Sequence, residues 1–139
     1  MFTNVVVALK PGLPIQPLLD LAKAAAAPSA RLHLVSRVQV GDGQELEHLE
    51  SVRSALESAA AELEGEGYAA SIEVGPVAVA VAGDINKAIE NREADLAVIG
   101  LAKRSRVSKL LLGSTAQKVI MEAACPVLST RFGPDVATP

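Results

Sequence analysis

The 139-residue sequence is poor in aromatic side chains, has no tryptophan and carries more acidic than basic residues. Aromatic residues make up 2% of the chain, so few rings are available to stack on nucleic-acid bases. The formal net charge of −3 does not suit a protein that must neutralise a phosphate backbone. We therefore expect no nucleic-acid partner.

Cysteine and long apolar runs are also scarce. Cys125 is the only cysteine, which excludes an internal disulfide and is compatible with a reducing compartment. No apolar run approaches the roughly 20 residues that a membrane-spanning helix needs. Residues 1–7 lack a basic region and are typical of a first strand rather than a signal peptide. These features predict a soluble, cytoplasmic protein with no membrane partner, folded as a single domain over residues 1–139.

Aliphatic residues, in contrast, are abundant, since half of the chain is hydrophobic. A core of Val, Ile, Leu and Ala is typical of parallel strands covered by alanine-rich helices. Apolar and alternating runs predict strands at 5–9, 31–38, 69–74, 96–99 and 126–130. Helical spacing predicts helices at 15–26 (ended by Pro28), at 44–64, after Asp84 as an N-cap, and at 114–124. Residues 77–81 alternate too, and extend the third strand past a break at Pro76.

The longest predicted helix is amphipathic. Its apolar residues follow one stripe and its other face is mostly glutamate, with Arg53 spaced to pair with Glu50 and Glu57. The stripe consists of Leu46, Leu49, Val52, Leu56, Ala59 and Leu63. We expect the glutamates to form a solvated face.

Strands and helices alternate along the whole chain. Short helical crossovers predict an α/β fold, with a doubly wound, five-stranded parallel sheet and helices on both faces, in a Rossmann-like arrangement. Ligands of such sheets bind at the carboxyl ends of the strands, at the point where the strand order reverses.

A candidate anion site lies near the C-terminus. A buried strand ends at Gly100, a basic loop with Lys103, Arg104, Arg106 and Lys109 follows, and a helix opens at Gly113-Ser114-Thr115. The backbone N–H groups of such a helix start bind phosphate well, and Lys10 and Lys103 add positive charge. Two alternatives remain open: a Ser114–Gln117 capping box explains the helix start, and a solvated loop explains the charges.

The segments 94–100, Gly113-Ser114-Thr115 and 125–128, with the Val-Val-Val-Ala strand near the N-terminus, resemble the universal stress protein family in order and spacing. The family signature is Gly, two residues, Gly, nine residues, Gly, then Ser or Thr. Gly100, Gly113 and Ser114 fill it here, whereas Lys103 replaces the second glycine. ATP-binding members also carry an aspartate where this chain has Leu9, which Lys10 follows.

The resemblance implies a small doubly wound domain, often a homodimer paired through its last strand, here with Val127 and Leu128. Some members bind ATP, and enzymatic activity is not a hallmark of the family. We therefore expect a non-catalytic stress-response protein, a ligand-responsive or scaffold dimer whose ligand is ATP or another phosphate-bearing molecule. One alternative is an ATP-binding member with slow hydrolysis, which places phosphates on Gly100, Gly113 and Ser114. The other is an interaction module that docks a larger protein partner through its basic loop or its acidic helix.

The remaining polar candidates receive structural interpretations. His33 and His48 have no cysteine or paired carboxylate at ligand spacing, so we expect no metal site, and no catalytic set is evident. Asp95 is expected to be hydrogen-bonded at the start of its strand, and Cys125 to be a small buried apolar residue.

Overall fold

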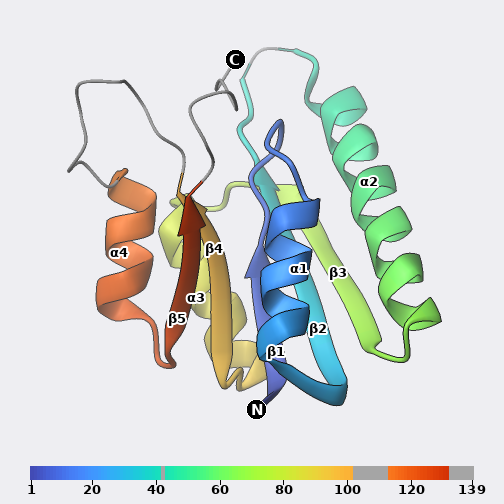
Figure 1. Cartoon of the computed structure of the whole chain (residues 1–139). Coiled ribbons are helices and arrows are strands. Elements are labelled where there is room, and N and C mark those ends of the chain that lie inside the picture. The colour runs from blue at the N-terminus through green and yellow to red at the C-terminus, as the bar shows by residue number, and fades with distance from the viewer. Residues whose placement is uncertain (42, 102–112, 132–139) are drawn as a thin grey trace.

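The computed structural model describes residues 1–41, 43–101 and 113–131 (Figure 1). In these residues strands and helices alternate along the chain. The elements are β1 (Phe2–Ala8), α1 (Gln16–Ala25), β2 (Ala26–Val38), α2 (Glu45–Gly65), β3 (Ala69–Pro76), α3 (Val81–Arg92), β4 (Leu96–Leu101), α4 (Ser114–Glu122) and β5 (Val127–Arg131).

The five strands form one parallel sheet in the order β3-β2-β1-β4-β5. The chain moves outward from β1 through β2 to β3, then returns to β4 on the other side of β1 and continues to β5. The order therefore reverses between β1 and β4. This confirms the predicted doubly wound α/β fold.

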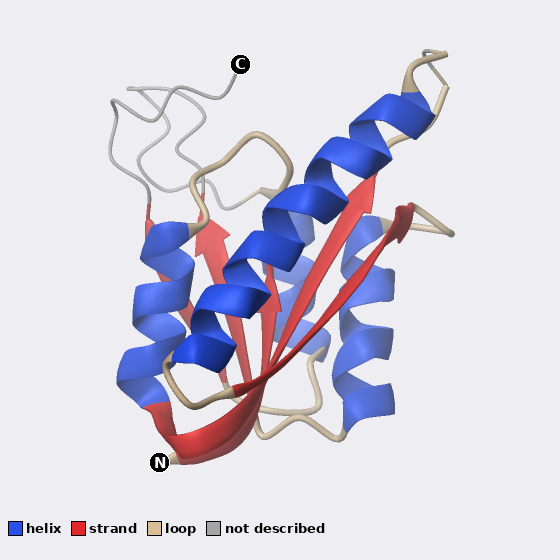
Figure 2. Cartoon of the chain, turned by 90° about the vertical axis from the view of Figure 1, so that its right-hand side faces the viewer, coloured by secondary structure: helices blue, strands red, loops and turns tan. Residues whose placement is uncertain are grey.

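Helices cover both faces of the sheet (Figure 2). Val5 and Val7 of β1 pack in one fully buried cluster with α1 and α2, whereas Val6 packs in a second cluster with α3 and α4. Because successive side chains of a strand point to opposite faces, a continuous run of valines serves both clusters. This double burial explains the uninterrupted β-branched run at the N-terminus.

The start of β2 differs from the prediction. Helix α1 ends at Ala25, and the strand begins at Ala26 rather than at residue 31, so Pro28 does not end the helix. The pairing of β1 with β2 is irregular there, since Phe2 pairs with Ala26 but Asn4 pairs with Arg31. Ser29 has a φ of 64° in this stretch. The irregularity accommodates Pro28, which cannot donate a ladder hydrogen bond.

Residues 77–81 are not a strand, which corrects a second prediction. β3 ends at Pro76, and α3 begins at Val81 with Ala80 as its N-cap, so Asp84 is not the N-cap. The Asp84 carboxylate instead accepts a hydrogen bond from the backbone N–H of Ala78 at 2.9 Å. This side-chain contact closes the turn, and Val79 is left 92% exposed.

The N-terminal turn of α2 also departs from the expected stripe. Leu46 is 70% exposed, so the buried face begins with the half-buried Leu49 and the buried Val52. Arg53 donates from Nη2 to the backbone oxygen of Val74 at 3.1 Å. It therefore ties α2 to the end of β3, where the sequence had suggested pairing with glutamates of its own helix.

Candidate functional site

The carboxyl ends of β1 and β4 lie side by side where the strand order reverses. Val5, Val6 and Val7 pair with Leu96, Ala97 and Val98. α4 begins at the same end of the sheet, and Figure 1 shows its first turn level with the arrowheads of β4 and β5. Fold topology thus brings a strand end and a helix N-terminus to one edge, which we call the carboxyl edge.

Leu9, just past the end of β1, points into the core. Its side chain is 5% exposed and packs in the cluster under α1 and α2. Its N–H donates to the oxygen of Val35 at 2.8 Å, and its carbonyl accepts from the buried Ser36 hydroxyl at 2.7 Å. Leu9 therefore fixes the end of β1 and offers no polar group for a nucleoside.

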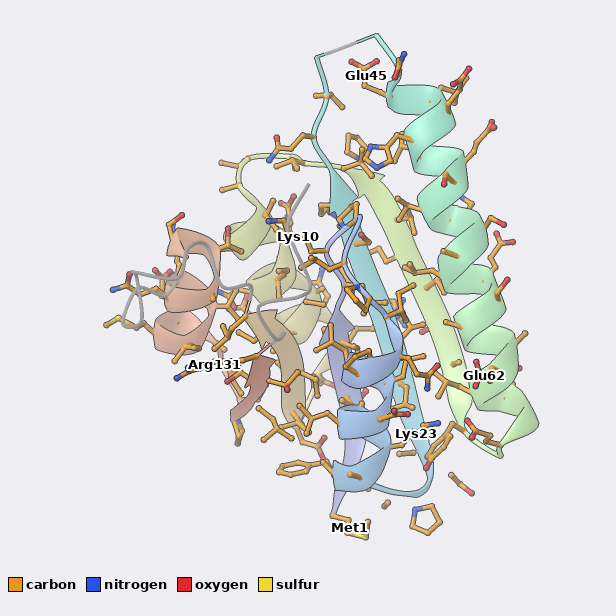
Figure 3. All side chains as sticks on the ribbon, turned by 45° about the horizontal axis from the view of Figure 1, so that its top comes forward. Met1, Lys10, Lys23, Glu45, Glu62 and Arg131 are labelled. Carbon is orange, nitrogen blue, oxygen red and sulfur yellow. The ribbon has the colours of Figure 1, made fainter. Side chains whose placement is uncertain are left out.

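Lys10, the next residue, is exposed at the carboxyl edge, and Figure 3 shows it beyond the end of β1. Its carbonyl accepts from Leu13 N–H at 3.2 Å, in a turn that contains Gly12 with a φ of 86°. The positive φ suits glycine, and it turns the chain directly after Lys10. None of the ion pairs among residues 1–41, 43–101 and 113–131 uses the ammonium group of Lys10.

Gly100 lies in the last part of β4, half-buried, and pairs with Thr130 of β5. Leu101 pairs with the exposed Arg131, the last residue of β5. Arg131 therefore supplies a second cation at the carboxyl edge (Figure 3). The sequence interpretation missed it as a site residue, because finding it requires the register between β4 and β5.

The start of α4 decides between two interpretations of Gly113-Ser114-Thr115. Gly113, which has no side chain to cap the helix, is the N-cap, and Ser114 is already the first helical residue. The predicted Ser114–Gln117 capping box, which needs Ser114 at the N-cap, is therefore wrong. Gln117 N–H donates to the oxygen of Gly113 at 3.0 Å, as an ordinary first helical hydrogen bond. Ser114 and Thr115 are exposed in the first turn, which contains no acidic residue. The positive end of the helix dipole is thus uncompensated by a side chain of this turn.

The structure brings Lys10, Gly100, Gly113, Ser114 and Thr115 to the same edge of the sheet. Lys103 and the other basic residues of its loop, Arg104, Arg106 and Lys109, lie outside the described residues. The described part of the site therefore offers one lysine, one arginine and a free helix N-terminus. Such a set suits a phosphate group and has no acidic member.

Asp95 lies at the opposite, amino end of β4 and has the hydrogen-bonded role predicted for it. Its carboxylate accepts from the N–H groups of Thr3 and Asn4 at 3.0 and 2.9 Å, and from the Thr3 hydroxyl at 3.2 Å. Desolvation alone would raise the pKa of Asp95, but these hydrogen bonds outweigh it and hold the pKa below its usual value. Asp95 therefore joins β4 to β1 and is remote from the carboxyl edge.

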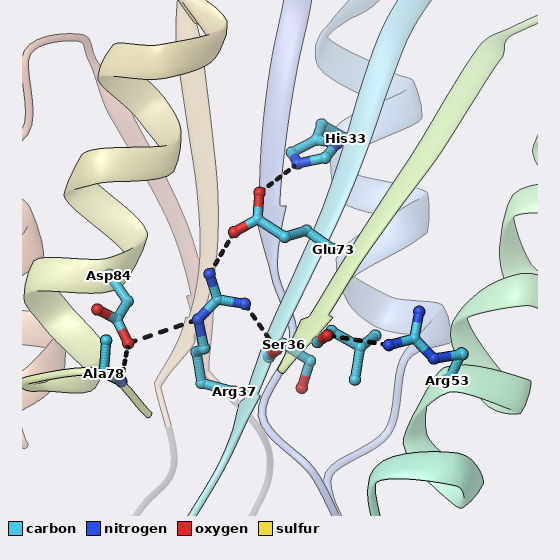
Figure 4. A network of polar contacts seen from close by, with 8 residues as sticks. His33, Ser36, Arg37, Arg53, Glu73, Ala78 and Asp84 are labelled. Atoms are coloured by element: carbon cyan, nitrogen blue, oxygen red, sulfur yellow. Dashed lines mark hydrogen bonds and ion pairs between the residues drawn. The ribbon is translucent and has the colours of Figure 1, made fainter. Parts of the chain in front are cut away.

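A polar network that sequence interpretation missed crosses β2, β3 and α3 (Figure 4). Buried His33 lies 2.6 Å from the Ser71 hydroxyl through Nδ1 and 3.3 Å from Glu73 through Nε2. Arg37 pairs with Glu73, and its Nε lies 3.4 Å from Asp84. The register could have revealed the first contacts, because His33 pairs with Ser71 and Val35 with Glu73.

No other described residues suggest a reaction centre. Within residues 1–41, 43–101 and 113–131, no three His, Cys, Asp or Glu residues are grouped to hold a metal ion. Cys125 is half-buried, and desolvation, with the nearby Asp95 charge, raises the pKa of its thiol and disfavours the reactive thiolate. None of the helices in the described ranges combines the length and apolarity needed to cross a bilayer.

Reversed strand order, an open helix N-terminus and flanking cations together define a doubly wound α/β domain with an anion-suited carboxyl edge. The chain belongs to the universal stress protein family, which it matches over residues 1–131. A universal stress protein of Mycolicibacterium smegmatis is 41% identical over 56 residues, which are 40% of this chain and 43% of that protein. The matched stretch thus spans less than half the length of this curated relative.

Solved structures share the fold over nearly the whole chain. A universal stress protein from Archaeoglobus fulgidus has a TM-score of 0.72 at 22% identity, with 93% of each chain covered. The A. fulgidus protein in complex with dAMP has a TM-score of 0.62 at 20% identity, covering 91% of this chain and 96% of that one. A family protein from Arabidopsis thaliana with AMP bound has a TM-score of 0.61 at 16% identity, covering 96% and 93%.

Proposed function

We propose that this protein is a non-catalytic, ligand-responsive stress-response protein of the cytoplasm that binds a phosphate-bearing nucleotide at the carboxyl edge. The observation that carries the proposal is the uncapped start of α4 at Gly113, at the same edge as the exposed Lys10. The dAMP and AMP held by the structurally similar proteins support a nucleotide as the ligand. The phosphate meets the N–H groups of Ser114 and Thr115, with Gly100 leaving room at the strand end.

In the proposed phosphate site, two lysines add to the positive charge of Arg131. Lys10 approaches from β1, and Lys103, in the signature position of the second glycine, supplies a point charge in place of bare backbone. Because Leu9 offers no polar group to the nucleoside, we propose that the phosphate contributes more of the affinity than the sugar or base does. ATP, which carries the most phosphate charge, is then expected to bind more tightly than AMP, and AMP more tightly than cyclic AMP.

Calorimetric titration with ATP, AMP, cyclic AMP and inorganic phosphate tests this function. We expect nucleotide binding that weakens about tenfold in Lys10→Glu, since a charge-assisted contact becomes a repulsion. Lys87→Glu is the matched control, because Lys87 is an exposed lysine of α3 whose change alters net charge equally. Lys103→Ala is expected to weaken binding as well.

Several outcomes would overturn the proposal. If none of the four ligands binds, the proposed site does not exist. If Lys10→Glu and Lys87→Glu lose equal affinity, the effect comes from net charge and not from a local contact of Lys10. Tighter binding by Lys103→Ala shows that this side chain obstructs the ligand. Steady release of phosphate from ATP by the pure protein contradicts the non-catalytic role and favours the slow-hydrolysis alternative.

We also propose that the protein is a homodimer paired through β5. β5 is an edge strand whose Val127 and Leu128 are only half-buried. A second copy of β5 would cover this apolar edge and satisfy its outward backbone groups.

A further inference from the structure

β3 forms the edge of the sheet farthest from β5. In a strand the backbone groups of alternate residues point to opposite sides. The N–H of Val77, just past β3, donates to Val38 of β2, and Val74 offers its carbonyl to Arg53 of α2. Odd-numbered residues of β3 therefore bond to β2, while Ala70, Ile72 and Val74 direct their backbone groups to the free edge.

The two halves of this free edge differ. Toward the C-terminal end, Arg53 occupies the carbonyl of Val74, and Pro76 has no N–H to offer. Toward the N-terminal end, Ala70 and Ile72 border a hollow of about 250 Å³. The C-terminal half of the free edge of β3 is thus blocked, and its N-terminal half is accessible.

The hollow, which we call the β3 groove, is lined by residues 70–72 of β3 and by Glu57, Ala60, Ala61 and Glu64 of α2. The two alanines have no side chain long enough to fill it, so a backbone can approach β3 closely. Glu57 and Glu64 are exposed and two helical turns apart, about 10 Å along the axis. None of the ion pairs found among the described residues uses either glutamate.

We propose that the β3 groove binds an extended, basic segment of a partner protein, which adds to β3 as a sixth strand. The free N–H and C=O groups of Ala70 and Ile72 bond to its backbone, as in other strand-addition complexes. Its side chains alternate, so one small residue on the α2 side meets Ala60 and Ala61. Lysine or arginine residues four positions apart, about 13 Å in a strand, flank this residue and reach Glu57 and Glu64.

A second copy of this chain fits the groove poorly. Pairing of β3 with β3 would bring four glutamates of two α2 helices toward one another. β3 itself carries Glu73 and no basic residue. Charge complementarity therefore favours a foreign basic strand over self-association at this edge.

The test uses the full chain and a fluorescent seven-residue peptide, Thr-Lys-Val-Thr-Val-Lys-Thr, capped at both ends. Anisotropy at low salt should report binding, which weakens as salt rises. The double variant Glu57→Lys/Glu64→Lys should weaken binding at least about tenfold, because both contacts become repulsive. Glu47→Lys/Glu50→Lys changes the net charge equally on the same helix, outside the groove, and should cost less than about threefold.

Backbone pairing has its own signature. N-methylation of alternate peptide residues removes donors on one side of the strand only, so one of the two alternating patterns should abolish binding and the other should not. Ala70→Pro, which removes an outward N–H without touching the β2 ladder, should weaken binding, whereas Ala70→Ser should not. Circular dichroism verifies that each variant is folded.

Equal losses in the two double variants, or indifference to both methylation patterns, would overturn the proposal. A dimer of the unmodified protein that Ala70→Pro dissociates would show that a second copy occupies the groove instead.

Discussion

At the residue scale, His33 is a buried titratable group whose surroundings shift its pKa. It is 2% exposed and faces Ser71 and Glu73 of β3, Arg37 of β2 and Arg92 of α3. Desolvation lowers the pKa of His33, the hydrogen bond to Glu73 opposes this, and the positive charges of Arg92 and Arg37 add to the lowering. At pH values between the lowered pKa of the folded state and the ordinary pKa, His33 is therefore neutral in the folded protein and protonated in the unfolded chain.

This difference gives stability a definite pH dependence. Below the ordinary histidine pKa of about 6.5, the unfolded state binds more protons, so the free energy of unfolding falls as pH falls. The slope from one group is at most about 1.4 kcal/mol per pH unit, and it ends below the folded-state pKa. Burial alone would raise the pKa of Glu73, but its contacts with Arg37 and His33 outweigh this and lower the pKa. Glu73 therefore adds a loss of stability only near and below its ordinary pKa of 4.5.

Denaturant unfolding of the wild type and of His33→Gln at about pH 7, 6 and 5 measures this effect. We expect His33→Gln to flatten the pH dependence, since glutamine keeps hydrogen-bonding groups but does not titrate. His48→Gln, at the exposed histidine of α2, is the matched control substitution. Parallel curves for His33→Gln and the wild type would contradict the assignment.

At the element scale, Asp84 joins the β3–α3 turn to the sheet. Its side chain is 10% exposed, accepts from Ala78 N–H and pairs with Arg37, which in turn binds Glu73. Asp84→Asn removes the charge and leaves Arg37 with one carboxylate. We expect the free energy of unfolding to fall by about 1–3 kcal/mol, the usual cost of losing a charge-assisted contact of a largely buried group.

The matched control for that variant is Asp20→Asn. Asp20 is 63% exposed and lies 3.7 Å from Lys23 on the same helix. An exposed pair of this kind contributes little, so we expect a change below about 0.5 kcal/mol. A similar loss of stability in both variants, measured by chemical denaturation, would mean that Asp84 does not hold the turn.

The same elements explain how far the sequence could predict the structure. The five strands and their parallel arrangement could be predicted from the hydrophobic period and the short helical crossovers, because burial on two faces leaves a continuous apolar run such as 5–9. Residues 77–81 misled the interpretation, since their alternation has a strand period but the Asp84 side chain closes a turn there. Contacts between elements, such as Arg53 with Val74, leave no local signal in the sequence.

The candidate site was predictable to a similar degree. Strand topology alone placed Gly100, Gly113 and Lys10 at one edge, because parallel strands end together. The capping box was wrong because its spacing is met by Ser114 and Gln117 while the backbone places Gly113 at the cap. Arg131 and the His33 network required the register between strands, which composition and periodicity do not supply.

At the scale of the whole molecule, the sheet has two edges of different character. The free edge of β3 lies beside Glu57 and Glu64 of α2, and Arg53 blocks its C-terminal half. β5 is short, and its apolar side chains are half-buried. The carboxyl edge lies between them, at the ends of the strands. We therefore propose that the nucleotide, the basic peptide and the second copy bind at different parts of the sheet, with Arg131 at the end of β5 nearest to both the first and the third.

The proposed dimer provides the sharpest test of that separation. Ala97 N–H donates to Pro126, so the even-numbered residues of β5 bond to β4 and exposed Ser129 directs its N–H outward. Ser129→Pro removes this donor without breaking the β4 ladder and should yield a monomer in light scattering, whereas Ser129→Ala should remain a dimer. We expect the Ser129→Pro monomer to bind both the peptide and nucleotide as the wild type does. An unchanged dimer mass would exclude pairing through β5, and loss of peptide binding on dissociation would show that the two edges are coupled.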